Sequence, residues 1–422
     1  MTAERTLTVF MDGIRVGAVS QTPQGDTTFH YDDDYQDDPT ATPLSVSMPL
    51  GRREHKSRVV LPFLQGLLPD RPGVLDRLSR QYHSSTHPFA LLRHVGRDTA
   101  GALQFLPPGE DSPDTANHQG DVERHSAEDI DRLMGDLIKA ADSWGESRAI
   151  GRWSLAGAQT KVALFRLPDG AWGTPRDATP TTHILKPAHL KALDRHDINE
   201  LVTTRAAGLL GLPVADCESF VTASGHRVFV SRRYDRVRAD GRWRRLHQED
   251  LCQTMSVAPI RKYQEDGGPS ANQIARLLRL EIADAAARVQ AQETFFSALV
   301  FAACAGCTDS HAKNYSLLLD GPGVRLAPLY DLGTLLPHEA VDDRFKVAMA
   351  VDGEYRLRHI GLRHFLTLAK RLQIPADRAE AAVEGIRHGL AGAFAAAAAD
   401  LDDPFAQTVA DAVAAQAESR DW

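Results

Sequence analysis

Apolar positions along the chain predict short strands and helices in its first part and long helices in its last third. Weak alternation on either side of Asp12-Gly13 predicts a β-hairpin made of residues 7–10 and 14–17. Further helices are expected at 61–80, 88–95, 126–144, 361–372, 376–399 and 404–419, and short strands at 101–105, 162–167 and 181–187. The last two helices are rich in Ala and indicate a packed bundle.

One polar stretch lies between a predicted helix and a predicted hairpin. The apolar run 295–307 predicts a buried helix, and strands 315–320 and 324–330 flank a Gly-Pro-Gly turn. If the hairpin folds symmetrically about this turn, Asp331 lies beside Asn314, and Asp309 is on the loop just before. Three polar side chains therefore converge at the open end of one hairpin.

These three side chains match the needs of phosphoryl transfer. The Asp309 carboxylate can orient a hydroxyl and accept its proton, while Asn314 and Asp331 offer oxygen ligands to Mg²⁺. The catalytic loop of protein kinases also spaces its Asp and Asn five residues apart. The alternative is that Asp309 caps a turn and Asn314 fills one.

Two further features suggest phosphate binding. Residues 154–161 form a loop of small residues that opens into strand 162–167, where backbone N–H groups could approach phosphates. The loop has one Gly, so it is neither a Walker A loop nor the three-glycine loop of kinases, and an ordinary tight turn is the alternative. Lys186 ends a strand, where it either neutralises phosphate charge or protects a sheet edge.

Two other sets of charged residues can each be interpreted in two ways. Asp197 and Glu200 fit a capping box for a helix that ends before Gly211, although Glu200 could instead pair with Lys186. Seven arginines cluster around a predicted hairpin at 228–246, either as a solvated ribbon, which we favour, or as a surface for an anionic partner.

Composition limits the class of protein. A chain of 422 residues is expected to form two or three subdomains, and a net charge of −8 argues against a surface that binds nucleic acid throughout. Without a membrane-length apolar run or an apolar signal core, a cytoplasmic protein is expected. Cys304 and Cys307 form a C-x-x-C pair, for which buried packing is favoured over a redox or zinc role.

Six ordered stretches together resemble the HipA toxins, Ser/Thr kinases of type II toxin–antitoxin modules. They are residues 154–161, 182–187, 248–254, 262–269, 308–314 and 328–331, and stretches 67–70, 96–98 and 101–103 add to the match. The resemblance implies an α+β fold, two-lobed and protein-kinase-like, with an N-terminal α/β subdomain and a mostly helical C-terminal lobe. The expected domains are 1–108, 109–235 and 236–422, with a linker at 107–120.

The resemblance also implies roles for particular residues. Asp309 would be the catalytic base, and Asn314 and Asp331 would bind Mg²⁺. The expected ATP contacts are Ala156, Gly157, Ala158, Gln159, Thr160, Lys161 and Lys186 at the phosphates, Arg232, Arg233 and Tyr234 in an adenine-contacting hinge, and His311, Ala312, Lys313, Asn314, Tyr330 and Asp331. Ser154 is where these kinases autophosphorylate, and a dianion there would compete with the phosphates of ATP.

The implied partner is a HipB-like DNA-binding antitoxin, with which the toxin represses its own operon. The implied substrate class includes aminoacyl-tRNA synthetases. Arg232 stands where family members can have an acidic residue, which backbone contacts to adenine would tolerate. The C-terminal helices carry no Lys-rich patch, so operator DNA is expected to be met mainly through the antitoxin.

The leading hypothesis is therefore a growth-inhibiting, ATP- and Mg²⁺-dependent protein Ser/Thr kinase. The alternatives are a nucleotide-binding corepressor without catalysis and a small-molecule kinase on the same scaffold. The joint presence of Asp309, Asn314, Asp331 and Lys186 argues against the corepressor, because binding alone needs no base.

Overall fold

The computed structural model describes residues 5–110, 122–142, 157, 159–176, 179–188, 195–339 and 344–419. The chain forms two compact units. The first comprises Met1–Pro187, Phe220–Ile260 and Leu317–Gly323, and the second comprises Ala188–Ser219, Arg261–Ser316 and Val324–Trp422. Most of the expected linker 107–120 lies outside the described residues, and the division at residues 108 and 235 stays a prediction.

The first unit begins with an antiparallel sheet. Its strand order is β4-β3-β2-β1-β5, formed by β1 (Arg5–Met11), β2 (Ile14–Gln21), β3 (Thr27–Tyr31), β4 (Glu54–His55) and β5 (Leu103–Leu106). Met11 pairs with Ile14, and Asp12 and Gly13 between them both have positive φ, at 47° and 83°. Two consecutive positive φ values define the tight hairpin turn that an Asp-Gly pair favours, so the predicted hairpin is confirmed.

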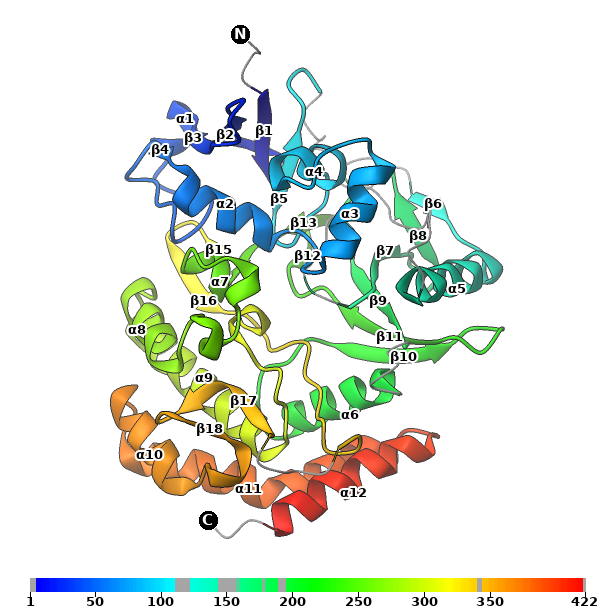
Figure 1. Ribbon diagram of the computed structural model, residues 1–422, viewed down its shortest axis with the longest axis vertical. Coiled ribbons are helices and arrows are strands. Elements are labelled where there is room, and N and C mark those ends of the chain that lie inside the picture. Colours follow the sequence, from blue (N-terminus) through cyan, green and yellow to red (C-terminus); the bar gives the residue numbers. More distant parts are fainter. Residues whose placement is uncertain are drawn as a thin grey trace. The chain divides into compact units, whose positions relative to one another are not determined.

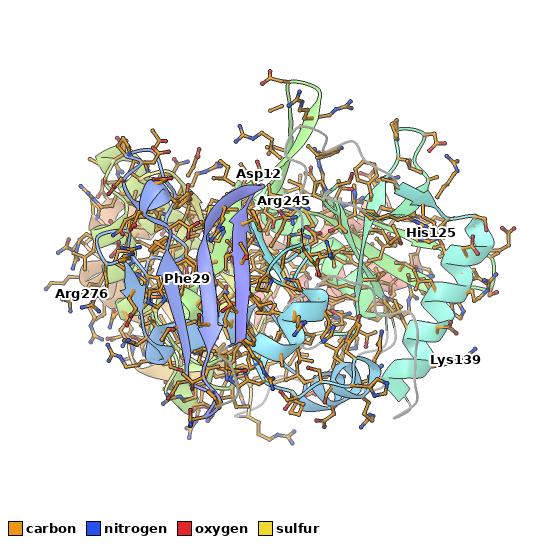
Figure 2. The ribbon with its side chains drawn as sticks, turned by 90° about the horizontal axis from the view of Figure 1, so that it is seen from above. Asp12, Phe29, His125, Lys139, Arg245 and Arg276 are labelled. Atoms are coloured by element: carbon orange, nitrogen blue, oxygen red, sulfur yellow. The ribbon has the colours of Figure 1, made fainter. Side chains whose placement is uncertain are left out.

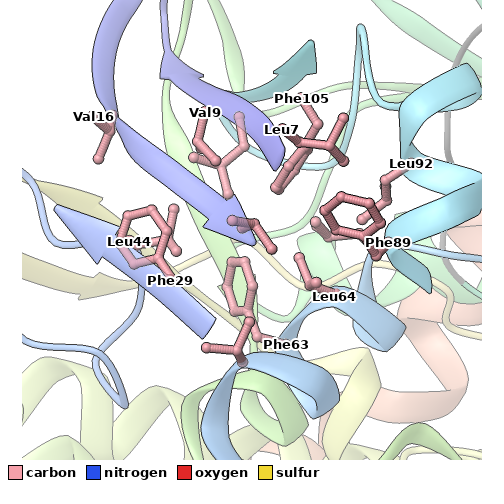
Figure 3. Close-up of a cluster of buried hydrophobic side chains, with 14 of the residues drawn as sticks. Leu7, Val9, Val16, Phe29, Leu44, Phe63, Leu64, Phe89, Leu92 and Phe105 are labelled. Carbon is pink, nitrogen blue, oxygen red and sulfur yellow. The ribbon is translucent and has the colours of Figure 1, made fainter. Parts of the chain in front are cut away.

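Three helices of the first unit accompany this sheet (Figure 1): α2 (Ser57–Gly66), α3 (Pro72–Gln81) and α4 (Pro88–Val95). The expectation of one helix over 61–80 is wrong. Arg71 is extended because it precedes Pro72, and Pro72 then starts a new helix at a position where its missing N–H costs nothing. The helix at 88–95 is confirmed. Figure 3 shows the core that these helices share with the sheet, with Leu7, Val9, Phe29, Phe63 and Phe105 fully buried.

A second sheet has the order β10-β11-β9-β7-β8-β6. Its strands are β6 (Val122–Arg124), β7 (Val162–Arg166), β8 (Trp172–Pro175), β9 (His183–Pro187), β10 (Cys217–Val221) and β11 (Arg227–Arg232). Helix α5 (Ala127–Asp142) supplies Ile130 and Met134 to a core with Leu164, Leu185 and Val228. The predicted helix 126–144 and the strand at 162–167 are therefore confirmed to within two residues.

The arginine-rich segment forms β12 (Arg236–Ala239) and β13 (Arg242–Arg245), joined by a turn at Asp240-Gly241. The favoured interpretation, a solvated ribbon, holds only in part. Arg232, Arg238, Arg242 and Arg244 are exposed, but Arg233, Arg236 and Arg245 are buried. The buried three have carboxylate partners from distant parts of the chain, which the sequence pattern did not show.

A three-stranded sheet has the order β14-β15-β16, formed by β14 (His247–Asp250), β15 (Ser316–Asp320) and β16 (Gly323–Leu326). The predicted hairpin exists, but its second strand ends at Leu326 and not at Tyr330. Pro328 has no N–H for a ladder, and Leu329 instead forms a parallel bridge with Val214, with Ala215 N donating to Leu329 O at 2.8 Å.

The second unit is built mainly from helices (Figure 1): α6 (His196–Leu209), α8 (Ala271–Glu281), α9 (Ala285–Cys304), α10 (Leu362–Arg371), α11 (Ala376–Ala399) and α12 (Pro404–Glu418). Helix α11 packs against α6, α9, α10 and α12, so the expected bundle is confirmed. A hairpin of β17 (Lys346–Val351) and β18 (Glu354–Arg356) was not predicted. Within the described ranges, no helix is long and apolar enough to cross a bilayer.

The capping box expected at Asp197 and Glu200 is wrong. The residue before helix α6 is Arg195, which has a positive φ of 61° and makes no side-chain cap. Asp197 and Glu200 both lie inside the helix and are buried, and Glu200 Oε2 is 3.4 Å from His196 Nε2.

Candidate active site

The loop that carries Asp309 begins where helix α9 ends. Gly306 has a φ of +69°, and a Cβ on it would lie 2.7 Å from Leu336 Cγ, so only glycine fits there. The helix therefore ends at Cys304, three residues earlier than predicted, with Cys307 N donating back to Ala302 O at 2.8 Å. Cys304 and Cys307 form no disulfide and are buried, as the packing interpretation expected.

Asp309 presents its carboxylate to solvent, since 66% of its side chain is exposed. Two side chains approach one of its oxygens, Oδ1. The Tyr263 hydroxyl donates a hydrogen bond to it, and His311 Nε2 lies 3.8 Å away. A carboxylate that is exposed but held on one side is suited to receive a proton on the other.

Asn314 closes the loop that starts at Asp309. Its amide nitrogen donates to the backbone oxygen of Asp309 at 2.8 Å, and a 3-10 helix, Ala312–Asn314, forms the end of the loop. Because the amide nitrogen is engaged with the loop, the amide oxygen is the atom left for a metal ion.

The segment after β16 returns to this loop. Tyr330 Oη donates to the Lys313 backbone oxygen at 2.7 Å and lies 2.7 Å from Ser316 Oγ. Asp331 follows in a left-handed conformation with a φ of 58°, which is strained for a residue other than glycine. The Tyr330 side chain thus contacts the residues on either side of Asn314, whereas the position of Asp331 beside Asn314 stays a prediction.

The carboxylates of Asp309 and Asp331 both act on the pKa of His311. Its burial lowers its pKa, while the charges of Asp309 and Asp331 act in the opposite direction and Lys262 reinforces the lowering. The ring is therefore neutral at pH 7. Within the described part of the chain, its buried Nδ1 makes no hydrogen bond, so a polar ligand would satisfy this atom.

The loop expected to hold phosphates is described only in part. Ser154, Ala156 and Ala158 lie outside the described residues, and Gln159 and Thr160 are half-buried. Gly157 has a φ of +103°, and a Cβ on it would lie 2.7 Å from Lys161 Nζ. The Asp70 N–H donates to Gly157 O at 3.2 Å, so a segment of the N-terminal part supports this loop.

Lys186 lies on a central strand. Strand β9 runs between β11 and β7, with Lys186 opposite Phe229, and the residue is 6% exposed. The alternative of a lysine that protects a sheet edge is therefore wrong. The Lys186 ammonium group is buried and lies 5.3 Å from the Phe229 ring centre. A buried charge of this kind is suited to binding a ligand of opposite charge, not to facing water.

The expected hinge, residues 232–234, uses its side chains in different ways. Arg232 is exposed, and the Tyr234 hydroxyl donates to the Gln248 side-chain oxygen. The Arg233 guanidinium is buried and donates two hydrogen bonds to the Asp235 carboxylate, at 3.0 and 2.8 Å. The Arg233 side chain is therefore committed to the interior, and its backbone N–H donates to Thr182 O at 2.9 Å.

Sequence reasoning missed the ion network that holds this segment. Asp98 accepts from Arg236 Nη2 at 3.0 Å, Arg245 Nε at 3.1 Å and Arg233 Nη1 at 3.3 Å. At the edge of the network, the Arg245 N–H donates to Asp12 Oδ1 at 3.0 Å, and Figure 2 shows these two residues next to each other. The signal was present in the 96–98 stretch, to which no role was assigned.

Tyr263 was also missed. Stretch 262–269 was part of the resemblance, but nothing in the sequence connected it to Asp309, which is 46 residues away.

The residues present fit a magnesium ion held partly by phosphates. No group of three or more His, Cys, Asp or Glu side chains in the described ranges is placed to hold a metal. Mg²⁺ usually takes one or two protein ligands and completes its shell with phosphate and water oxygens. The amide oxygen of Asn314 and the carboxylate of Asp331 are ligands of this kind.

The candidate residues divide between the two units. Gly157, Lys161 and Lys186 belong to the first, while the second contains Asp309, His311, Asn314, Tyr330 and Asp331.

Family models match two consecutive parts of the chain, and the second part contains all of these candidate residues. A family model described as HipA N-terminal domain matches residues 7–106, and one described as HipA-like C-terminal domain matches residues 153–394. The chain is 34% identical to the protein Y4mE of Sinorhizobium fredii over 98% of both chains. It is 29% identical to the serine/threonine-protein kinase toxin HipA of Shewanella oneidensis, over 84% of this chain and 81% of that protein.

A solved structure provides the comparison of folds. The chain matches a protein in the complex of Shewanella oneidensis HipA, HipB and operator DNA with a TM-score of 0.82 and 25% identity, over 98% of this chain and 97% of that one. The fold is thus α+β, two-lobed and kinase-like. With both parts matched by family models and nearly the whole length aligned with its relatives, the chain belongs to the HipA family.

Proposed function

We propose that the chain is an ATP- and Mg²⁺-dependent protein serine/threonine kinase that acts as the toxin of a type II toxin–antitoxin module. Membership of the HipA family supports this proposal, and a relative in Shewanella oneidensis has the name of a serine/threonine-protein kinase toxin. The observation that carries the chemistry is the loop in which Asp309 is exposed and the Asn314 amide nitrogen donates to the Asp309 backbone, which leaves the amide oxygen for a ligand.

In the proposed reaction, Asp309 orients the hydroxyl of a serine or threonine. As the hydroxyl oxygen attacks the γ-phosphorus, its proton passes to the Asp309 carboxylate and the bond between the γ-phosphorus and the oxygen of ADP breaks. Lys161 and Lys186 would hold the phosphates of ATP. Asn314 and Asp331 would hold Mg²⁺, which, when bound, supplies positive charge to the phosphate oxygens.

Further parts of the proposal concern partners and regulation. A HipB-like antitoxin would neutralise the toxin and contact operator DNA, which is supported by the solved complex that contains HipA, HipB and operator DNA. A translation component such as an aminoacyl-tRNA synthetase is the proposed substrate class, on the family resemblance. Phosphorylation of Ser154 would inactivate the enzyme, because a dianion beside the phosphate loop competes with ATP.

The test is intact mass after incubation with ATP and Mg²⁺, with the wild type and Asp309→Asn in parallel. We expect the wild type to gain one phosphate, assigned to Ser154 by peptide mass. Asp309→Asn should react at least about 100-fold more slowly, because the amide cannot accept the proton, yet should unfold at the same temperature. Induced expression should stop growth of a host for the wild type only.

The opposite results have distinct meanings. A similar phosphate gain in Asp309→Asn would refute the assignment of the base. If the wild type gained no phosphate and phosphorylated no protein, a screen of metabolites would test for a small-molecule kinase. Binding of ATP by calorimetry without any transfer would favour a corepressor.

A further inference from the structure

The loop of residues 261–270 adopts a defined conformation, and the proposed function assigns it no role. A Cβ on Gly268 would lie 2.2 Å from the backbone oxygen of Arg261, so the loop closes tightly on itself. Gln264 Oε1 accepts from the Ala350 N–H at 3.0 Å, and Lys346 Nζ lies 2.8 Å from Glu265 Oε1. Both contacts fasten the loop to strand β17, so the loop has supports other than the catalytic loop.

The side chain that this loop presents to the catalytic loop is Tyr263. Its hydroxyl donates to Asp309 Oδ1, and its ring stands edge-on to the His311 ring, with 5.0 Å between centres and 83° between planes. Lys262 Nζ lies 5.7 Å from the centre of the same ring. The ring that carries the hydroxyl is thus in contact with a buried histidine and lies near the positive charge of Lys262.

Asp309 has few other restraints. Its side chain is 66% exposed, so packing does not select one orientation of the carboxylate. Within the described ranges, Oδ2 makes no hydrogen bond or ion pair, while Oδ1 has both Tyr263 and His311 nearby. A hydrogen bond to one carboxylate oxygen fixes the direction of the other, because the two oxygens share a plane.

We propose that Tyr263 is a positioning residue of the kinase reaction, which holds Asp309 by Oδ1 so that Oδ2 accepts the proton of the substrate hydroxyl. This inference rests on the proposed function. Tyr263 itself exchanges no proton: the proton leaves the substrate oxygen for Oδ2 as that oxygen bonds to the γ-phosphorus and ADP leaves.

The test compares Tyr263→Phe with Tyr355→Phe. The first substitution keeps the ring on His311 and removes only the donor; the second removes a hydroxyl from β18 in the same unit that, within the described ranges, makes no hydrogen bond to Asp309. Because a hydrogen bond to a charged group is lost, the rate of phosphate incorporation at saturating ATP should fall about 10-fold or more in Tyr263→Phe. The ATP concentration for half the maximal rate should change less than about 2-fold, and Tyr355→Phe should match the wild type in both.

Two results would overturn the inference. One is an unchanged or increased rate at saturating ATP in Tyr263→Phe. The other is a fall in rate that is accompanied by an equally large increase in the ATP concentration for half-maximal rate. This result would place Tyr263 in nucleotide binding.

A second readout does not require catalysis. With ¹³C-labelled aspartate, the carboxylate signal of Asp309 is assigned by its absence in Asp309→Asn. This signal should move in Tyr263→Phe and stay in place in Tyr355→Phe; an unmoved signal in Tyr263→Phe would contradict the contact. If the wild type transferred no phosphate, the proposed function would fail, and this signal alone would decide whether Tyr263 holds Asp309.

Discussion

At the scale of single residues, Glu249 of the first unit has a carboxyl group with a raised pKa. It is buried, with Oε1 accepting from the Val46 N–H at 2.8 Å and Oε2 lying 2.5 Å from Ser45 Oγ. Burial raises the pKa of Glu249 to about 8, although both hydrogen bonds act against the increase. The folded protein therefore keeps a proton at neutral pH that the unfolded chain releases.

The proton on Glu249 makes the stability of the fold depend on pH. As pH rises from about 4.5 to 8, the unfolded state loses the Glu249 proton and the folded state retains it, so this group's contribution to stability falls. Glu249→Gln stays neutral and lacks this loss. Its free energy of unfolding should thus rise relative to the wild type across this range, by about 1.4 kcal/mol per pH unit at most.

Urea unfolding at pH 5 and pH 8 measures the effect. Glu265→Gln is the control, since Glu265 is exposed and pairs with Lys346 at the surface. A difference between wild type and Glu249→Gln that is the same at both pH values would show that Glu249 is ionised in the fold.

At the scale of elements, the loop from Gly157 to Lys161 depends on one glycine for two reasons. Gly157 has a positive φ and leaves space for Lys161 Nζ, which a Cβ would approach to 2.7 Å. Gly170, in the turn between β7 and β8, also has a positive φ of 87°, but a Cβ there meets nothing within 4 Å. Substitution of Gly170 therefore tests backbone strain alone, whereas substitution of Gly157 tests backbone strain together with displacement of Lys161.

We expect Gly157→Ala to weaken ATP binding by about 10-fold or more, because it displaces a charge that would hold the phosphates. Gly170→Ala has the same backbone cost, about 1 kcal/mol, and should leave ATP affinity unchanged. Isothermal calorimetry with ATP and Mg²⁺ measures both. Equal losses of affinity in the two variants would mean that Lys161 has no part in phosphate binding.

At the scale of the molecule, the Asp98 network joins distant segments within the first unit. Burial alone would raise the pKa of Asp98, but Arg236, Arg233 and Arg245 outweigh it and hold this pKa well below its usual range. Asp98 belongs to the N-terminal part, while Arg233 lies in the proposed hinge and Arg236 and Arg245 follow it in the chain. The network thus couples the N-terminal part to the segment proposed to contact adenine.

Asp98→Asn should lower the free energy of unfolding by about 3–5 kcal/mol, because it leaves buried guanidinium groups without enough negative charge. The matched control is Asp32→Asn, whose carboxylate pairs with Arg15 at 2.7 Å at the surface. Its effect should stay below about 1 kcal/mol. Guanidinium unfolding curves compare the two, and equal effects would contradict a structural role for the network.

The sequence alone determined the features whose causes are local. Asp12-Gly13 specifies a tight turn by its own backbone preferences, and the bundle helices α11 and α12 follow from helix-forming residues between clear boundaries. From their spacing around one hairpin, the sequence also predicted a shared site for Asp309, Asn314 and Asp331; this stays a prediction, because the second strand of that hairpin ends at Leu326.

Only the tertiary structure decided the features that depend on distant partners. The arginines of one hairpin divide into exposed and buried according to where Asp98 and Asp235 lie. Strand β16 stops at Leu326 because Leu329 pairs with Val214, and Tyr263 reaches Asp309 across 46 residues. In each case the free energy comes from a contact between segments far apart in the chain, and no local pattern of hydrophobic and polar residues records such a contact.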